Sequence, residues 1–166
     1  MCRSKLPKTN SENANDNELS HRLYGKVETE FCVSYLYYYK SGITQKLLHR
    51  FKYNNFPEIG ELIGAWFGID LITKNQATQI DLIIPIPLYP RKERERRYKQ
   101  NQHFAKGISD AISIPVDFKS LIRVEYQNSQ TKKSKEQRWK NADQAFSITN
   151  TERIKNKRIL LVDEMM

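Results

Sequence analysis

The sequence predicts an α/β domain built on a parallel β-sheet, and three observations lead to that fold class. Residues 81–88 (DLIIPIPL) and 157–163 (KRILLVD) are short, continuous apolar runs, which are typical of buried parallel strands. An amphipathic helix is predicted between them, over residues 101–113. The order strand, loop, helix, strand, long polar connection, strand is typical of doubly wound α/β proteins.

The N-terminal half precedes this sheet and divides into smaller pieces. Residues 9–20 (TNSENANDNELS) are polar turn formers and predict an exposed loop, whereas residues 31–39 (FCVSYLYYY) predict a strand or hairpin arm. Apolar residues at helical spacing then predict two helices, from residue 43 to about 52 and from Pro57 to about 73. We therefore expect a polar arm (1–25), a strand plus two-helix subdomain (26–75) and the α/β domain (76–166).

Prolines mark the predicted boundaries of two strands. Pro85 and Pro87 indicate where the first strand ends and a rigid loop begins, and Pro115 opens another short strand. Consecutive parallel strands joined by a crossover have their carboxyl ends on the same side, and open parallel sheets bind ligands at that edge. The residues that follow the two apolar runs are therefore the candidates for function.

Composition limits the cellular setting. The formal charge of +9 favours a polyanionic partner, either nucleic acid or a polyphosphate. Cys2 and Cys32 are too few for a disulfide framework or a four-ligand zinc site. No signal peptide and no run of about 18 apolar residues is visible, so we expect a cytoplasmic protein with no membrane partner.

Charged residues follow both apolar runs. Six basic residues lie between positions 91 and 99, a density that suits diphosphate oxygens but also a solvated loop or a nucleic-acid patch. We expect residues 91–102 to form a mobile, exposed loop that leads into the helix. Asp163 and Glu164 follow the second run, and such carboxylates accept hydrogen bonds from sugar hydroxyls or bind magnesium jointly with phosphates.

The order of these pieces resembles the ComF competence-protein family, whose members carry a type I phosphoribosyltransferase domain related to amidophosphoribosyltransferases. The resemblance rests on PIPLYPRKERERRYKQNQ (85–102), on SQTKKSKEQRWKN (129–141) and on the apolar strand ending in two acids. KLPKTN, FKYNNFPEIGELIG and QAF also look like family positions. The fold implied is a phosphoribosyltransferase-type parallel sheet with flanking helices and an N-terminal helical and β appendage.

The resemblance implies a role for each matching residue. Asp163 and Glu164 match the catalytic acids that hold the ribose 2′- and 3′-hydroxyls of phosphoribosyl pyrophosphate (PRPP). In this chemistry PRPP, bound with Mg²⁺, loses pyrophosphate through a cationic sugar transition state. The implied ligand-binding residues fall in a pyrophosphate loop, in a stretch matching R-G-Y-N-Q, and in a flexible loop that closes over the site: Ile86, Pro87, Leu88; Arg96, Tyr98, Gln100; Gln130, Thr131, Arg138, Asn141.

The chain also departs from the family pattern. Family members continue after the acids into a Thr-Thr-Gly loop that cradles the 5′-phosphate, whereas these 166 residues continue only to Met166. Arg97 and Lys99 replace a glycine and an asparagine of the motif. Of the family's Cys-x-x-Cys zinc ribbon only Cys2 remains, and Cys32 is expected to be a buried thiol, so we predict no zinc.

The expected function follows from the residues that match the family and from those that depart from it. We expect a truncated ComF-like protein, associated with competence and DNA uptake, that is inactive as written and binds PRPP weakly. Loss of about three charge-assisted hydrogen bonds to the 5′-phosphate removes on the order of 4 to 9 kcal/mol. The strand at residues 159–162 should then be an exposed sheet edge. The alternative is a non-enzymatic basic module that binds single-stranded DNA or a competence helicase.

Overall fold

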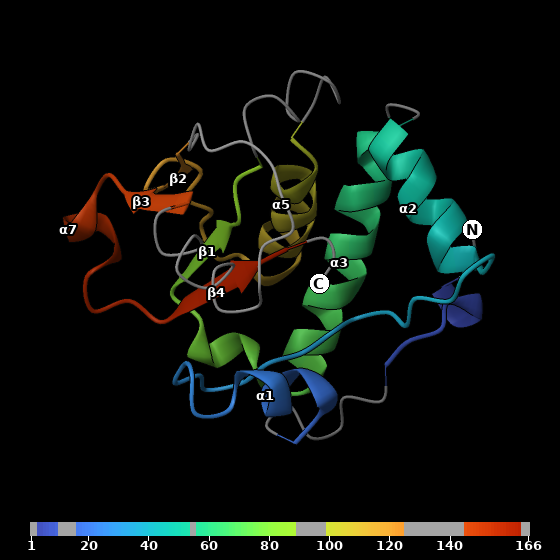
Figure 1. The fold of residues 1–166 in the computed structure, drawn as a ribbon, viewed down its shortest axis with the longest axis horizontal. Coiled ribbons are helices and arrows are strands. Elements are labelled where there is room, and N and C mark those ends of the chain that lie inside the picture. Colours follow the sequence, from blue (N-terminus) through green and yellow to red (C-terminus); the bar gives the residue numbers. More distant parts are fainter. Residues whose placement is uncertain (1–2, 10–15, 54–55, 89–98, 125–144, 164–166) are drawn as a thin grey trace, which may run out of the picture. The chain divides into compact units, whose positions relative to one another are not determined.

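A computed structural model describes residues 3–9, 16–53, 56–88, 99–124 and 145–163 (Figure 1). The chain divides into two compact units, Met1–Arg50 and Phe51–Met166. The boundary falls inside helix α2 (Ile43–Tyr53), whose two ends belong to different units. The two units are therefore described separately.

In the N-terminal unit the aromatic segment 31–39 is not a strand, which corrects the expectation from its composition. Its β pairing with other described residues is a single antiparallel bridge, Lys8 to Leu36. Two backbone bonds flank that bridge, from the Thr9 N–H to the Tyr35 carbonyl (3.1 Å) and from the Tyr37 N–H to the Pro7 carbonyl (2.8 Å). Aromatic and β-branched residues favour a sheet only where a partner strand supplies a ladder, and here the partner is one residue long.

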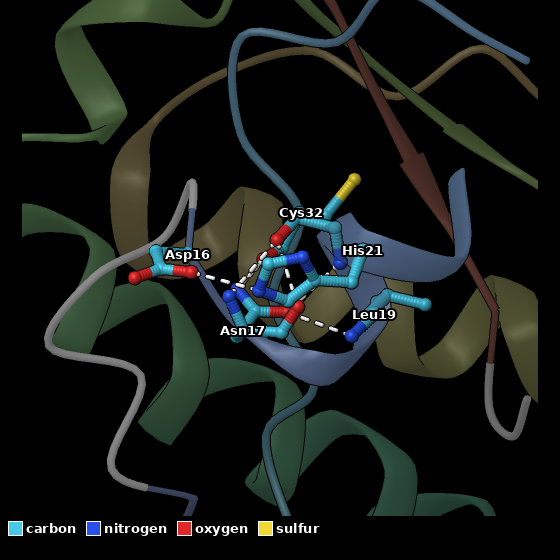
Figure 2. A network of polar contacts seen from close by, with 6 residues as sticks. Asp16, Asn17, Leu19, His21 and Cys32 are labelled. Atoms are coloured by element: carbon cyan, nitrogen blue, oxygen red, sulfur yellow. Dashed lines mark hydrogen bonds and ion pairs between the residues drawn. The ribbon is translucent and has the colours of Figure 1, made fainter. Parts of the chain in front are cut away.

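The polar stretch before this segment is partly helical, which corrects a second expectation. Helix α1 (Glu18–Leu23) begins where an exposed loop was predicted, because Asn17 caps it. The Asn17 Oδ1 accepts the backbone N–H of Leu19 at 3.0 Å (Figure 2). It also accepts the Ser20 N–H (3.1 Å), and the Ser20 Oγ accepts the Asn17 N–H (2.9 Å). Asparagine and serine side chains form hydrogen bonds with nearby backbone groups both in turns and at helix N-caps. Composition alone therefore does not distinguish a loop from the start of a helix.

Figure 2 also shows how Asn17 joins α1 to the segment that contains Cys32. The Asn17 Nδ2 donates to the Cys32 carbonyl oxygen at 2.6 Å, and His21 Nε2 lies 2.8 Å from Asp16 Oδ1. The Cys32 thiol itself is partly exposed and contacts the Thr29 hydroxyl at 3.4 Å. The buried thiol expected from sequence is therefore wrong, because the segment that carries it is not enclosed in a sheet.

Both helices predicted after residue 42 are present, as α2 and α3 (Pro57–Thr73). In the C-terminal unit α3 packs against α5 (Gln100–Ile112), and the two helix backbones approach closely at two glycines. A Cβ atom at Gly64 would collide with the Phe104 carbonyl oxygen, and a Cβ atom at Gly107 would collide with the carbonyl oxygen of Glu61. Side chains larger than hydrogen are therefore excluded from the centre of this helix pair.

The predicted parallel sheet is present in the same unit. Strand β1 (Leu82–Pro85) pairs in parallel with β4 (Ile159–Val162), in the register Leu82 with Ile159 through Pro85 with Val162. On the other edge of β1, Ile83 forms a parallel bridge with Val116, where a short strand was expected. β1 ends at Pro85, as its prolines predicted, and α5 follows it along the chain before β4.

An antiparallel hairpin completes the sheet structure, and the sequence did not predict it. Strands β2 (Leu121–Arg123) and β3 (Phe146–Ile148) pair in the register Leu121 with Ile148 through Arg123 with Phe146. The Val124 N–H donates to the Ala145 carbonyl at 2.9 Å and closes the described end of the hairpin. The short helices η1 (Arg3–Lys5), η2 (Ala77–Gln79) and α7 (Thr151–Ile154) complete the described elements.

The core of the C-terminal unit lies where β1 meets the helices. All four β1 residues are buried, together with Leu71 of α3 and Ile108 of α5. Within the described ranges, no helix is both long enough and apolar enough to cross a membrane.

Candidate functional site

The carboxyl ends of β1 and β4 lie at the same edge of the sheet, as the sequence predicted. The Ile86 N–H donates to the Val162 carbonyl at 2.8 Å and extends the parallel ladder by one step beyond the strands. The residues that follow each strand are thereby neighbours: Ile86, Pro87 and Leu88 after β1, and Asp163 after β4, all of them half-buried. Four of the expected site residues are therefore brought together.

Asn101 links these two strand ends, and the sequence analysis did not identify it. It lies in the first turn of α5 and is buried. Its Nδ2 donates to the Ile86 carbonyl oxygen at 2.7 Å and to Asp163 Oδ1 at 2.9 Å. A signal was available, because Asn101 stands at helical spacing from the core residues Ala105 and Ile108 and so falls on the core face of the helix. An asparagine on such a face needs internal partners.

Gln100 is placed differently from the expectation that it contacts a ligand. Its side chain is fully buried, and its Nε2 donates to the Lys52 carbonyl oxygen at 3.2 Å. The resemblance put this residue in an exposed motif, whereas the helix begins at Gln100 and turns it inward. Residues 100–102 likewise belong to the helix, so the loop predicted over 91–102 ends before them.

The β2–β3 hairpin contributes a positive charge beside the loop after β1. The Arg123 guanidinium lies over the Phe146 ring, 4.8 Å from its centroid, and its Nη1 is 3.5 Å from the Pro87 carbonyl oxygen. This is a long hydrogen bond, so it indicates proximity more than strength. A cation held against an aromatic ring at this edge suits an anionic ligand, and sequence analysis missed it because β2 was not predicted.

Several expected site residues lie outside the described residues, so the structure gives them no position. They are Glu164, Arg96, Tyr98, Gln130, Thr131, Arg138 and Asn141. Most of the basic run at 91–99 falls in the same category. The described residues on either side of residues 125–144 are bonded to each other, from the Val124 N–H to the Ala145 carbonyl at 2.9 Å.

Three other carboxylates have perturbed pKa values, and each has a structural partner. Asp81 precedes β1, and the Arg158 guanidinium and backbone N–H hold its pKa well below the usual range. A hydrogen bond from His103, together with Lys106, lowers the pKa of Glu61.

Asp117 is the buried member of this group. Burial raises its pKa, but hydrogen bonds from the Ser120 hydroxyl and from the Lys119 and Ser120 N–H groups, with the Arg153 charge, lower it further than burial raises it. All three carboxylates are therefore ionised and serve the fold rather than the strand-end site.

Metal binding is constrained by the available donors. Within the part of the chain that the structure describes, no three His, Cys, Asp or Glu side chains are grouped so as to hold a metal ion. Cys2 lies outside those residues. The strand-end site offers one described carboxylate, Asp163, which suits Mg²⁺ that arrives already bound to phosphate oxygens.

No family model matches this chain, and neither a curated protein nor a solved structure matches it. Membership of the ComF family therefore stays a prediction that rests on the sequence motifs.

Proposed function

We propose that the C-terminal unit is a phosphoribosyltransferase-like domain of the ComF type that binds a magnesium complex of PRPP at the joined ends of β1 and β4. The observation that supports this most directly is the parallel pairing of β1 with β4, which makes Asp163 a neighbour of residues 86–88. A phosphosugar diphosphate presents hydroxyls at one end and a dense negative charge at the other. A carboxylate beside the backbone of a short loop and a cation matches that pattern.

Each group at this edge has a part in the proposed complex. Asp163, with Glu164 next to it in sequence, accepts hydrogen bonds from the ribose hydroxyls. The loop at residues 86–88 faces the diphosphate, and Arg123 contributes positive charge beside that loop. Magnesium enters as part of the substrate, bound by the diphosphate oxygens.

Binding at the described groups is proposed to be weak. These groups are one carboxylate, Asp163, and one cation, Arg123, and no group for a 5′-phosphate is among the described residues of this edge. Without about three charge-assisted hydrogen bonds to that phosphate, the affinity is lower by a thousandfold or more. A ligand that would bind at micromolar concentration is expected to bind at millimolar concentration.

An NMR titration of the 166-residue chain with Mg·PRPP tests this proposal, because the method reads millimolar affinities. We expect saturable shifts at residues 86–88 and 163, and binding that weakens about tenfold or more in Asp163→Ala. Asp81→Asn is the matched control, since it changes a carboxylate about 16 Å away at the opposite end of the same strand pair. Equal weakening in both variants, or no saturable shift at millimolar ligand, would refute the proposal.

Two further results have definite meanings. Saturable micromolar binding would contradict the weak affinity and would mean that another group replaces the phosphate cradle. Preference for single-stranded DNA over Mg·PRPP would favour the alternative, a binding module without enzymatic activity. The net charge of +9 is compatible with such a module, because DNA is a polyanion. In that case the logarithm of the affinity should fall linearly with the logarithm of the salt concentration, with a slope set by the phosphates contacted.

A further inference from the structure

Asn101 uses its side-chain amide group to connect two backbone segments that are far apart in sequence. The Nδ2 atom carries two hydrogens and has two acceptors, the Ile86 carbonyl oxygen at 2.7 Å and Asp163 Oδ1 at 2.9 Å. One acceptor is a backbone carbonyl after β1 and the other is a side-chain carboxylate after β4, so a single planar group links the Asp163 side chain to the loop after β1. Both donors of the amide are committed to this task.

The oxygen atom of the same amide accepts no hydrogen bond from any described residue. The Asn101 Oδ1 atom is buried, and among the described residues it has no hydrogen-bond partner, although the residue as a whole is only 3% exposed. A buried acceptor without a donor is costly, and such atoms in native structures call for an explanation. Leucine has the same branching at Cγ and would avoid that cost. The two N–H bonds are therefore the reason for an asparagine at this position.

We propose that Asn101 is a positioning residue that fixes the Asp163 carboxylate against the loop after β1. It acts from behind the site, because a side chain that is 3% exposed does not itself contact a ligand. Its consequence for ligand binding rests on the proposed function, whereas its contact with Asp163 does not. The ligand group concerned is the hydroxyl pair of the phosphosugar, which needs an acceptor of fixed orientation.

The first experiment requires no ligand. The Asn101 side-chain amide signals are followed by NMR in the wild-type chain and in Asp163→Ala. We expect both amide hydrogens to exchange slowly with water in the wild type, and one of the two to exchange much faster in the variant. Fast exchange of both hydrogens in the wild type, or identical exchange in the two proteins, would overturn the proposal.

The second experiment is a double-mutant cycle with Mg·PRPP as the probe. Asn101→Ala should weaken binding about tenfold, the usual consequence of losing a hydrogen bond to a charged group. In an Asp163→Ala background the same substitution should have no further effect, since the group that it positions is gone. Effects that multiply would mean a general structural role and would overturn the proposal.

Two more variants separate positioning from folding. Asn101→Leu should bind as weakly as Asn101→Ala while retaining the wild-type unfolding temperature within a few degrees. Ser109→Ala removes a hydrogen bond of the same kind, from the Ser109 hydroxyl to the Ile114 carbonyl at 2.6 Å, about 12 Å along the same helix. It should leave the affinity unchanged, and a tenfold loss there would contradict the specific role of Asn101.

The two experiments fail in different ways. If the wild-type chain does not bind Mg·PRPP, the proposed function is wrong, and the exchange experiment alone decides the role of Asn101. If the wild type binds and Asn101→Ala binds equally well, the function stands and the positioning role is wrong.

Discussion

β1 and β4 are paired along four residues, yet they differ in how far each is enclosed. All of β1 is buried, with Ile83 fully inaccessible, whereas Leu161 of β4 is 56% exposed and Ile159 is 39% exposed. β1 has a neighbour on each edge, because Ile83 also bonds to Pro115 and Asp117 through its N–H (3.0 Å) and carbonyl (2.8 Å). Among the described residues, β4 is paired with β1 alone. A continuous apolar run thus predicts a strand but not its depth in the protein.

The largest effect expected from this difference is at Ile83. Replacing Ile83 by alanine removes buried methyl groups and leaves a cavity between the sheet and its helices, at a cost of about 2 to 5 kcal/mol. Urea denaturation followed by circular dichroism measures this loss. A cost below about 1 kcal/mol would mean that β1 is less enclosed than the structure indicates.

A smaller loss is expected at Asp117, which holds the segment along the second edge of β1. Its carboxylate accepts hydrogen bonds from Ser120 and from two backbone N–H groups, and it pairs with Arg153 at 2.8 Å. Asp117→Asn places an amide among these donors, so we expect a loss of about 1 to 3 kcal/mol at neutral pH. Thermal unfolding at pH 7 measures it.

The same substitution should change the pH dependence of stability. The pKa of Asp117 is lowered in the folded protein, so its contribution is present above the unfolded-state pKa of about 4 and is lost as the pH falls through the folded-state value. Asp117→Asn should therefore unfold with a flatter dependence on pH in the acidic range. An unchanged pH profile in the variant would contradict the shift.

A still smaller effect is expected at Asp81, at the opposite end of the strand pair from the candidate site. Its carboxylate accepts the Arg158 backbone N–H (2.8 Å) and both arms of the guanidinium (3.0 and 2.9 Å), all of them exposed to solvent. Solvent screens such a pair. Asp81→Asn should speed hydrogen exchange at the start of β4 and change global stability less than Asp117→Asn does. Equal losses in the two variants would reverse this order.

The smallest effect is expected on the open face of β4. Leu161→Thr keeps a β-favouring residue in an exposed position and should change stability by about 0.5 kcal/mol or less. It should also lower the tendency to self-associate, because it removes apolar surface from a sheet edge. Sedimentation at two protein concentrations measures this. A cost like that of Ile83→Ala would mean that Leu161 is covered in solution.

The contrast between the strands also shows what sequence could and could not predict. Long or strongly apolar elements were predicted with their types, because periodicity over α3 and the runs at β1 and β4 depend on local sequence. The β2–β3 hairpin was missed because each strand has three residues and its partner lies more than 20 positions away. Residues 31–39 had strand composition but lacked a partner, which no local pattern reveals.

At the candidate site the sequence predicted that two strand ends meet at one edge of the sheet, but it did not predict how the described side chains are oriented. Asp163 and residues 86–88 follow from strand ends, so a parallel pair was sufficient to bring them together. Gln100 and Asn101 depend on where α5 begins and on which way its first turn faces. Helix starts are the least reliable part of a sequence-based reading, and only a residue inside the helix follows the spacing of about 100° that fixes which way its side chain points.

The geometry of the candidate site depends on the glycines at the contact between α3 and α5, which lie outside the site. Gly107 is six positions from Asn101, or about 9 Å along a rigid helix. A methyl group at Gly107 would press on the backbone of α3 at Glu61, and α5 would have to shift to relieve the contact. A shift of about 0.5 Å at the first turn lengthens a 2.7 Å hydrogen bond toward the limit at which such a bond still counts. Tolerance to substitution at these glycines is therefore set as much by the alignment of a distant amide as by the packing of the two helices.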